Sequence, residues 1–413
     1  MSSEPTTTYY YDDGSIQSKE WRDQEGLLHR EDGPARTAYY DDGSIAREEW
    51  WQHGRTHRDG DSAITNYYRG GSVKSEAWYQ DGWLHRDGNP ARITYYRNGS
   101  IEIETWCQHD VLHRDDGPAV AEYDTDGNIK HEGWFQDGER HREDGPAWTW
   151  RQYPRFQKAR TEKWYQDNKL HRDDGPAVVE YDIDGTLRRE EWREGENYCR
   201  EDGPAFISYD PDGNTRRETW YDKDGERHRD NAPADIRYNE DGSVRSVVWW
   251  QHGEWHRDDG PAKTIYYEDG TLRLEEWWQH NVRHRDGAPA ETWYYEDGKI
   301  RHEGWYQNGK KHREDGPAWI DYRDEGAHVL EEWYQDDQPH RLDGPALTTY
   351  YKDGTHRREE WYQDGALHRD GGPAVIEYRR SGSIKKEQWY QQGERINPPT
   401  NVDVSTPDRG VEL

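Results

Sequence analysis

Residues 359–384 read EEWYQDGALHRDGGPAVIEYRRSGSI, and residues 104–129 read ETWCQHDVLHRDDGPAVAEYDTDGNI. The two stretches agree at the Trp, the His-Arg pair, the Pro-Ala pair, the Tyr and the Gly of the last turn. The His-Arg pair recurs along the chain, mostly every 28 residues, and Cys199-Arg200 replaces it once. Its His residues are His29, His57, His85, His113, His141, His171, His228, His256, His284, His312, His340 and His368. Such self-similarity is typical of repeat proteins and predicts thirteen tandem copies of one unit.

Two turn signals divide each unit. The first is an Asp-Gly pair or a relative of it, as at Asp42-Gly43, which suits the positive φ angles of a two-residue hairpin. The second is Asp-Gly-Pro-Ala, as in Asp32 to Ala35. The residues between turns are β-branched, aromatic or alternating. We therefore predict an all-β fold: an elongated, single-layer antiparallel β-meander of the repeat or solenoid type, with about two strands per 28-residue unit.

The composition favours a fold without a thick core. Of the 413 residues, 30% are hydrophobic and 34% are charged, which alone would indicate disorder. However, the chain contains 23 Trp and 30 Tyr, and disordered segments are poor in aromatic residues. Large amphipathic rings that cover a thin scaffold reconcile the two observations.

The turns also predict a register within one unit. Two-residue turns at Asp42-Gly43 and His53-Gly54 place the following residues opposite each other: Tyr39 and Ala46, Thr37 and Glu48, Ala35 and Trp50, and Trp50 and His57. Because side chains alternate between the faces of a strand, these residues share one face. The same positions recur in the other units, so we interpret this face as structural.

The recurring face predicts a structural ladder of Trp, His and Tyr columns. Its members include Trp50, Trp78, Trp106, Trp134, Trp277, Trp305, Trp361, His57, His85, His113, His284, His312, His368, Tyr39, Tyr95, Tyr266 and Tyr350. The opposite face changes between units and is the expected place for specificity. We take the following as a candidate interaction face: Trp148, Trp150, Arg155, Phe156, Tyr198 and Phe206.

The repeat pattern also predicts the organisation of the chain. We expect a flexible N-terminus over 1–8, repeats over 9–396, and a disordered tail over 397–413. Between about 148 and 230 the pattern is irregular. Two extra residues follow Trp148, and Trp220 to His228 is one residue longer than most equivalents.

The units resemble MORN repeats, in particular a variant found in bacterial proteins and large DNA viruses. Matching segments are YYEDGTLRLEEWWQHNVRH (266–284) and YYKDGTHRREEWYQDGALH (350–368), and the resemblance covers about residues 8–396. Where that variant has His-Gly-Pro, this chain has His-Arg-x-Asp-Gly-Pro, so its unit is longer. The resemblance implies a twisted antiparallel sheet and a scaffolding role, sometimes with self-association.

The motifs that resemble catalytic or metal-binding sites do not predict an enzyme. His-Arg-Asp, as at His113 to Asp115, resembles a kinase catalytic loop, but it recurs and the other kinase motifs are absent. Equivalent His residues two strands apart would be separated by about 9.6 Å, too far to share a zinc ion. We expect them to pack against Trp, and we predict no catalytic residue, metal or cofactor. The aromatic columns leave one alternative open, which is an aromatic cage for choline-like cations or carbohydrates.

Charge indicates the class of partner. The net charge of −30 disfavours nucleic acid and anionic membranes and favours basic proteins. Self-association through unpaired strands at the sheet ends is also expected. The N-terminus lacks the pattern of a secretory signal, and the only cysteines are Cys107 and Cys199. We therefore expect a cytoplasmic protein, in the host cytoplasm or virion if the source is viral, and a non-enzymatic scaffold.

Overall fold

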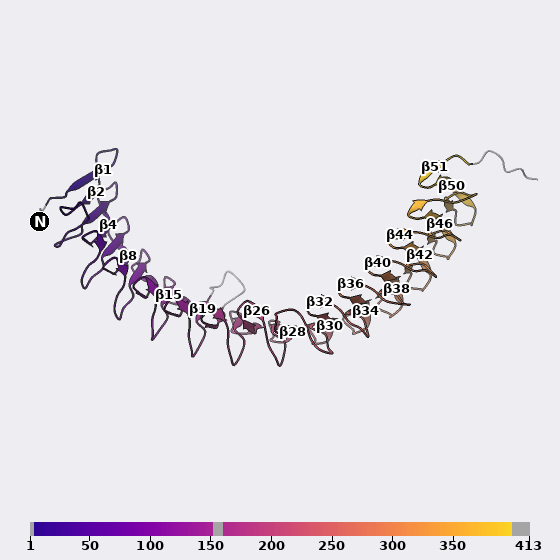
Figure 1. The fold of residues 1–413 in the computed structure, drawn as a ribbon, viewed down its shortest axis with the longest axis horizontal. Helices are drawn as coiled ribbons and strands as arrows, with labels where there is room; N and C mark the ends of the chain where they lie inside the picture. Colours follow the sequence, from indigo (N-terminus) through magenta and orange to yellow (C-terminus); the bar gives the residue numbers. More distant parts are fainter. Residues whose placement is uncertain (1–3, 152–159, 399–413) are drawn as a thin grey trace, which may run out of the picture. The chain divides into compact units, whose positions relative to one another are not determined.

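A computed structural model describes residues 4–151 and 160–398 of the chain. The described residues form strands and turns and contain no helix. The chain divides into two compact units, residues 1–215 with 223–225 and residues 216–222 with 226–413. Within each unit the hairpins follow one another in chain order (Figure 1). The predicted all-β antiparallel meander is confirmed.

In the first unit each long strand pairs with the next long strand. The long strands are β1 (Thr7–Tyr10), β2 (Ile16–Glu20), β3 (Arg36–Tyr39), β4 (Ile45–Glu49), β7 (Ile64–Tyr67), β8 (Val73–Ala77), β11 (Arg92–Tyr95), β12 (Ile101–Thr105), β15 (Val120–Tyr123), β16 (Ile129–Gly133), β19 (Trp148–Arg151), β20 (Arg160–Lys163), β23 (Val178–Tyr181), β24 (Leu187–Glu191) and β27 (Phe206–Tyr209). The strands begin at Thr7, inside the segment predicted to be flexible; residues 1–3 and 399–413 lie outside the described residues.

The second unit has the same construction. Its long strands are β28 (Thr215–Thr219), β29 (Asp235–Tyr238), β30 (Val244–Val248), β33 (Lys263–Tyr266), β34 (Leu272–Glu276), β37 (Glu291–Tyr294), β38 (Ile300–Gly304), β41 (Trp319–Tyr322), β42 (His328–Glu332), β45 (Leu347–Tyr350), β46 (His356–Glu360), β49 (Val375–Tyr378) and β50 (Ile384–Gln391).

Most repeats add a second, shorter hairpin outside the long sheet. In the first unit these hairpins are β5 (Trp51–Gln52) with β6 (Arg55–Thr56), β9 (Tyr79–Gln80) with β10 (Trp83–Leu84), β13 (Cys107–Gln108) with β14 (Val111–Leu112), β17 (Phe135–Gln136) with β18 (Glu139–Arg140), β21 (Tyr165–Gln166) with β22 (Lys169–Leu170), and β25 (Arg193–Glu194) with β26 (Asn197–Tyr198). In the second unit they are β31 (Trp250–Gln251) with β32 (Glu254–Trp255), β35 (Trp278–Gln279) with β36 (Val282–Arg283), β39 (Tyr306–Gln307) with β40 (Lys310–Lys311), β43 (Tyr334–Gln335) with β44 (Gln338–Pro339), β47 (Tyr362–Gln363) with β48 (Ala366–Leu367), and the end of β50 with β51 (Glu394–Ile396).

The long hairpins do not have the predicted two-residue turn. Tyr40 N–H donates to Ser44 O at 2.8 Å, and only Gly43 has a positive φ, of 80°. This is a three-residue loop, and a bulge at Ala46 in β4 then shifts the register between Ala38 and Tyr39. The predicted pair Thr37–Glu48 is confirmed, whereas Tyr39 lies opposite Ile45 and not Ala46.

The short hairpins have the predicted two-residue turn. His53 and Gly54 have φ angles of 44° and 76°, as a type I′ turn requires, and His57 N–H donates to Trp50 O at 3.0 Å. The predicted pairing of Ala35 with Trp50 is wrong. Trp50 N–H donates to Ala63 O of the next repeat, at 2.7 Å. Each Trp therefore joins successive repeats at the point where the long strand gives way to the short hairpin.

The core is narrow and continuous. One fully buried Ala per repeat forms a column: Ala35, Ala63, Ala91, Ala119, Ala147, Ala177, Ala205, Ala234, Ala262, Ala290, Ala318, Ala346 and Ala374. Beside it lies a small apolar cluster of Ile64, Ala77, Leu84, Cys107 and Leu112, joined by Tyr79 and Ala91. These residues come from the long strands and the short hairpins, so the core lies between the two rows.

Candidate interaction surface

The recurring Trp is covered by the Arg of the His-Arg pair. Arg114 Cζ lies 3.9 Å from the centroid of the Trp106 ring. The guanidinium donates to Pro118 O at 3.3 Å and to Asp116 Oδ1 at 3.0 Å. The same stack occurs for Arg30, Arg58, Arg86, Arg142, Arg172, Arg200, Arg229, Arg257, Arg285, Arg313, Arg341 and Arg369 over their own Trp. The motif Arg-x-Asp-Gly-Pro is thus a clasp that closes the repeat on its Trp.

Among the predicted ladder residues, Trp50, Trp78, Trp106, Trp134, Trp277, Trp305 and Trp361 each carry such an Arg. The expectation that His packs against these rings missed this arrangement. His and Arg are adjacent in the sequence, and it is Arg that lies over the ring. The recurrence of Arg beside His was the available signal.

The His column instead joins each repeat to the next. His57 Nδ1 accepts the Asp81 backbone N–H at 3.1 Å, from the first turn residue of the following short hairpin. Since Nδ1 accepts, Nε2 carries the proton, and it lies 3.2 Å from Asp59 Oδ1. The Nδ1 contact recurs at His113, His284, His312 and His368. His85 differs among the described residues, since its Nδ1 makes no such bond. Its ring lies against His109, with centroids 4.4 Å apart.

Tyr and Glu form a third connection between repeats. The Tyr95 hydroxyl donates to Glu76 Oε2 of the preceding repeat at 2.7 Å. Burial and the bond to Glu104 raise the pKa of the equivalent Tyr123 to about 12, and burial and Glu331 raise the pKa of Tyr350. Val247 and Lys19 occupy the Glu position opposite Tyr266 and Tyr39, and the Lys19 ammonium lies 5.8 Å from the Tyr39 ring.

The face predicted to vary lies mainly between the long strands and the short hairpins. There it packs against the chain itself. Trp148 lies 3.9 Å from the His131 ring and 4.9 Å from the Arg140 guanidinium, measured to ring centroids. Phe206 packs edge-on against Tyr198 at 6.2 Å. Trp150 is 40% exposed, whereas Arg155 and Phe156 lie outside the described residues.

In the second unit the same face holds a buried charge cluster. The Arg283 guanidinium donates to Glu291 at 2.7 Å and to Glu276 at 2.6 Å, between the rings of Trp278 and Tyr306. Burial of Glu291 opposes its ionisation, but bonds from His302 and Trp293 and the Arg283 charge outweigh burial. They lower the pKa of Glu291 to about 2. The residues of the variable face therefore differ between repeats in how they fill the space between the long strands and the short hairpins.

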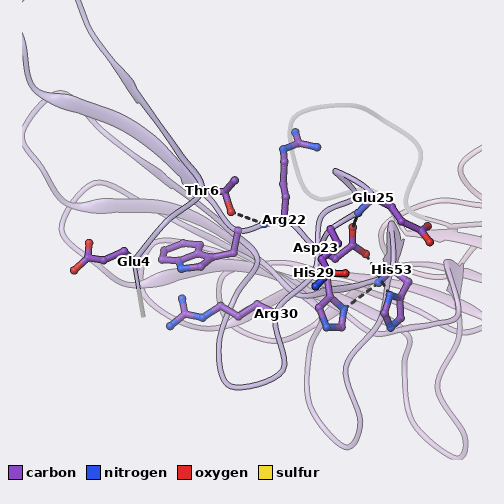
Figure 2. Close-up of a pocket in the computed structure, with 10 residues that line it drawn as sticks. Glu4, Thr6, Arg22, Asp23, Glu25, His29, Arg30 and His53 are labelled. Atoms are coloured by element: carbon purple, nitrogen blue, oxygen red, sulfur yellow. Dashed lines mark hydrogen bonds and ion pairs between the residues drawn. The ribbon is translucent and has the colours of Figure 1, made fainter. Parts of the chain in front are cut away.

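One cavity, of about 510 Å³, lies beside the turn between Trp21 and His29 (Figure 2). It is lined by residues that include Glu4, Trp21, Arg30, His29 and His53. Several of its polar groups are already engaged: Thr6 Oγ1 accepts Arg22 N–H at 2.9 Å, and His53 Nδ1 lies 3.2 Å from Asp23 Oδ2. Sequence reasoning did not find this cavity. The extra residue between Trp21 and His29 was the available signal.

That extra residue changes the turn. Asp23 Oδ1 accepts the N–H groups of Glu25 and Leu27, so the hairpin caps itself and retains only the bridge between Arg22 and Leu28. Asp222 accepts Glu226 N–H in the same way at the start of the second unit, where Tyr221 and Arg227 form a bridge. The irregularity noted at Trp220–His228 is therefore a lengthened, self-capped turn.

No described residues form a group of three or more His, Cys, Asp or Glu that could hold a metal ion. No helix long and apolar enough to cross a membrane occurs in the part of the chain that the structure describes. Neither Cys107 nor Cys199 forms a disulfide in the part of the chain that the structure describes, and burial raises the pKa of Cys107 to about 11.

These features define a tandem β-hairpin repeat protein in which each repeat is closed by an Arg–Trp clasp. Within the chain, residues 290–308 are similar to a MORN repeat, since the model of the MORN repeat variant matches them. The match spans β37, β38, Trp305 and β39. The clasp residues His312 to Pro317 follow the matched segment.

No curated protein matches the chain. Among solved structures, alternansucrase in complex with isomaltononaose is 10% identical, with 77% of this chain and 18% of that chain covered and a TM-score of 0.16. The TcdB2-TccC3 structure without its hypervariable C-terminal region is 13% identical, with 91% and 20% covered and a TM-score of 0.12. This chain thus spans a fifth or less of both. Choline binding protein F from Streptococcus pneumoniae is 13% identical, with 87% and 97% covered and a TM-score of 0.14. Similarities this weak carry no functional argument.

Proposed function

We propose that this protein is a non-enzymatic scaffold that binds other proteins. The observation that carries the proposal is that the chemistry-bearing residues occur as columns, and their contacts join repeats to one another. The Arg, His, Tyr and Glu columns are engaged in clasps and inter-repeat bonds. What remains for a partner is a long, regular, acidic surface, and repeat arrays of this kind commonly serve as extended binding surfaces.

The alternative is capture of choline-like cations or carbohydrates by aromatic cages. The geometry does not favour it, because the chain's own cations already occupy the rings. Arg114 covers Trp106, and Lys311 lies 4.2 Å from Trp319 and 5.0 Å from Tyr334. A ligand cation would have to displace a guanidinium that is also hydrogen bonded. Titration with choline or a maltooligosaccharide should leave Trp fluorescence unchanged, and a saturable change would favour the alternative.

The partner class follows from the charge. A net charge of −30 suits a basic protein, and the site of action proposed here is the cytoplasm, in keeping with a chain that contains only two cysteines. Self-association through the outer strands of the sheet is a further proposal. Deleting residues 369–396 should then change the oligomeric state in sedimentation velocity, and an unchanged state would argue against association at that end.

Capture experiments test the scaffold directly. The full chain should retain a stoichiometric protein from extracts of its source, and the purified pair should form a complex of fixed mass in mass photometry. High salt should weaken the complex, because exposed acidic groups would supply much of the attraction. Absence of any stoichiometric partner and of self-assembly would refute the proposal.

A further inference from the structure

The short hairpins of the first unit carry an apolar row on their outer side. Leu27, Arg55, Trp83 and Val111 occupy the equivalent position in four successive repeats, and we call them the outer stripe. Leu27, Trp83 and Val111 are 41%, 52% and 42% exposed. Trp is among the residues enriched at the centres of protein interfaces.

Three members of the outer stripe lie against the short-hairpin turn of the next repeat. The Leu27 side chain lies against the turn of the next short hairpin, so that a Cβ on Gly54 would be 3.3 Å from it. Val111 lies in the same way against Gly138, and the stem of Arg55 lies 3.8 Å from the Cβ position of Gly82. Leu27, Arg55 and Val111 thus each lie against the following turn.

Exposed carboxylates border the stripe. Asp81 lies in the turn just before Trp83, and its side chain is 71% exposed. Asp137 lies in the turn that Val111 contacts, and its side chain is 94% exposed. Asp87 and Asp115 follow in the loops after β10 and β14 and are 94% and 82% exposed. An apolar line with acidic borders suits a partner that offers apolar side chains flanked by Lys or Arg.

The spacing indicates the conformation of that partner. Successive repeats are joined by two long strands, so equivalent positions are about 10 Å apart at a strand separation of roughly 4.8 Å. Residues seven apart on an α-helix lie on one face and are separated by about 10.5 Å. Residues three apart on an extended strand span a similar distance but face opposite sides. A second copy of this chain does not fit, because its described residues contain no helix and its net charge is −30.

We propose that the outer stripe docks a basic amphipathic α-helix of another protein, with one apolar side chain every seventh residue. This rests on the proposed function and deepens it. Trp83 is the anchor of the interface, Leu27 and Val111 extend it, and Arg55 interrupts it with a like charge. The second unit provides a natural comparison, since its Val282 is 38% exposed but stands between Glu254 and Lys310 at the neighbouring equivalent positions.

The test uses the full chain and a fluorescein-labelled 28-residue peptide with Leu at every seventh position and Lys at most others, in fluorescence anisotropy. The double variant Trp83→Ser, Val111→Ser should bind at least tenfold more weakly. The control Val282→Ser should bind within about twofold of the parent, and Arg55→Leu should bind more tightly. These exposed changes should leave hydrogen-exchange protection of the long strands unaltered.

Two outcomes would overturn the stripe proposal. In one, the double variant binds as tightly as the parent. In the other, a peptide of the same composition but scrambled order binds equally well, so that charge alone accounts for the affinity. If either occurs while the chain still forms a stoichiometric complex with a protein from its source, the stripe inference fails and the scaffold proposal stands.

Discussion

Replacing Gly117 by Ala should open one Arg–Trp clasp. The φ angle of Gly117 is not in the left-handed region, so the backbone itself would accept Ala. The obstacle is Arg114, because an added Cβ would lie 2.5 Å from its Cζ. The guanidinium would have to leave the Trp106 ring and give up its bond to Pro118 O.

The magnitude follows from the two interactions. A cation–π contact at a partly buried site contributes about 0.5–2 kcal/mol, and a hydrogen bond from a charged donor contributes about 1.5–3 kcal/mol. Since the two are lost together and are not strictly additive, we expect a local loss of about 2–4 kcal/mol. Long repeat arrays need not unfold in one step, so the assay is hydrogen exchange of amides within 104–123.

The chain supplies a matched control in Gly372. It occupies the equivalent position after Arg369, but the preceding Gly371 has a φ of 70°, and an added Cβ would lie 3.0 Å from the nearest Arg369 atom. Repeats with this second loop type carry Ala232 and Ala288 at that position. Gly372→Ala should therefore cost less than about 1 kcal/mol, because two other repeats already carry Ala at this position.

A double-mutant cycle decides the mechanism. In an Arg114→Ala background the clasp is already absent, so Gly117→Ala should add almost nothing to the loss of protection. If Gly117→Ala is as destabilising without Arg114 as with it, the clash with the guanidinium is not the cause and the reasoning is refuted.

Three further predictions test other contacts. His113→Ala removes an acceptor for Asp137 N–H and a partner for Asp115. Hydrogen exchange of the Asp137 amide should therefore quicken by roughly tenfold or more, while exchange near His85 should not change. An unchanged rate at Asp137 would show that the His column does not join repeats. The pKa of Glu291 is lowered from 4.5 to about 2, so its contribution to stability is present above pH 4.5 and is lost as the pH falls toward 2. Protection of 282–304 should fall over that range in the parent but not in Glu291→Gln, which should already be less stable by up to about 3 kcal/mol at pH 7. Because burial raises the pKa of Cys107 to about 11, two units above its usual value, its alkylation at pH 8 should be about 100-fold slower in the folded than in the urea-unfolded chain, as followed by mass spectrometry, and similar rates would contradict its burial.

The proposed surface was only partly accessible to sequence reasoning. Trp148 and Phe206 belong to the predicted interaction face because their position varies between repeats. In the structure they lie against His131 and Tyr198. Variation between repeats does not distinguish a position that faces a partner from a buried position that each repeat fills with a different side chain. Trp83 and Val111 also vary, and only their exposure separates them from Trp148.

The sequence by itself determined the repeat, the two long strands, the type I′ turn at His53-Gly54 and the Thr37–Glu48 pair. These follow from turn chemistry and period-two alternation, which act over a few residues. Only the tertiary structure decided that Trp50 bonds to Ala63, that Arg114 and not His113 covers Trp106, and that His57 reaches Asp81. Contacts between neighbouring repeats depend on how one hairpin is stacked on the next. In a periodic sequence each column has several possible partner columns at the same spacing along the chain, so the sequence does not select among them.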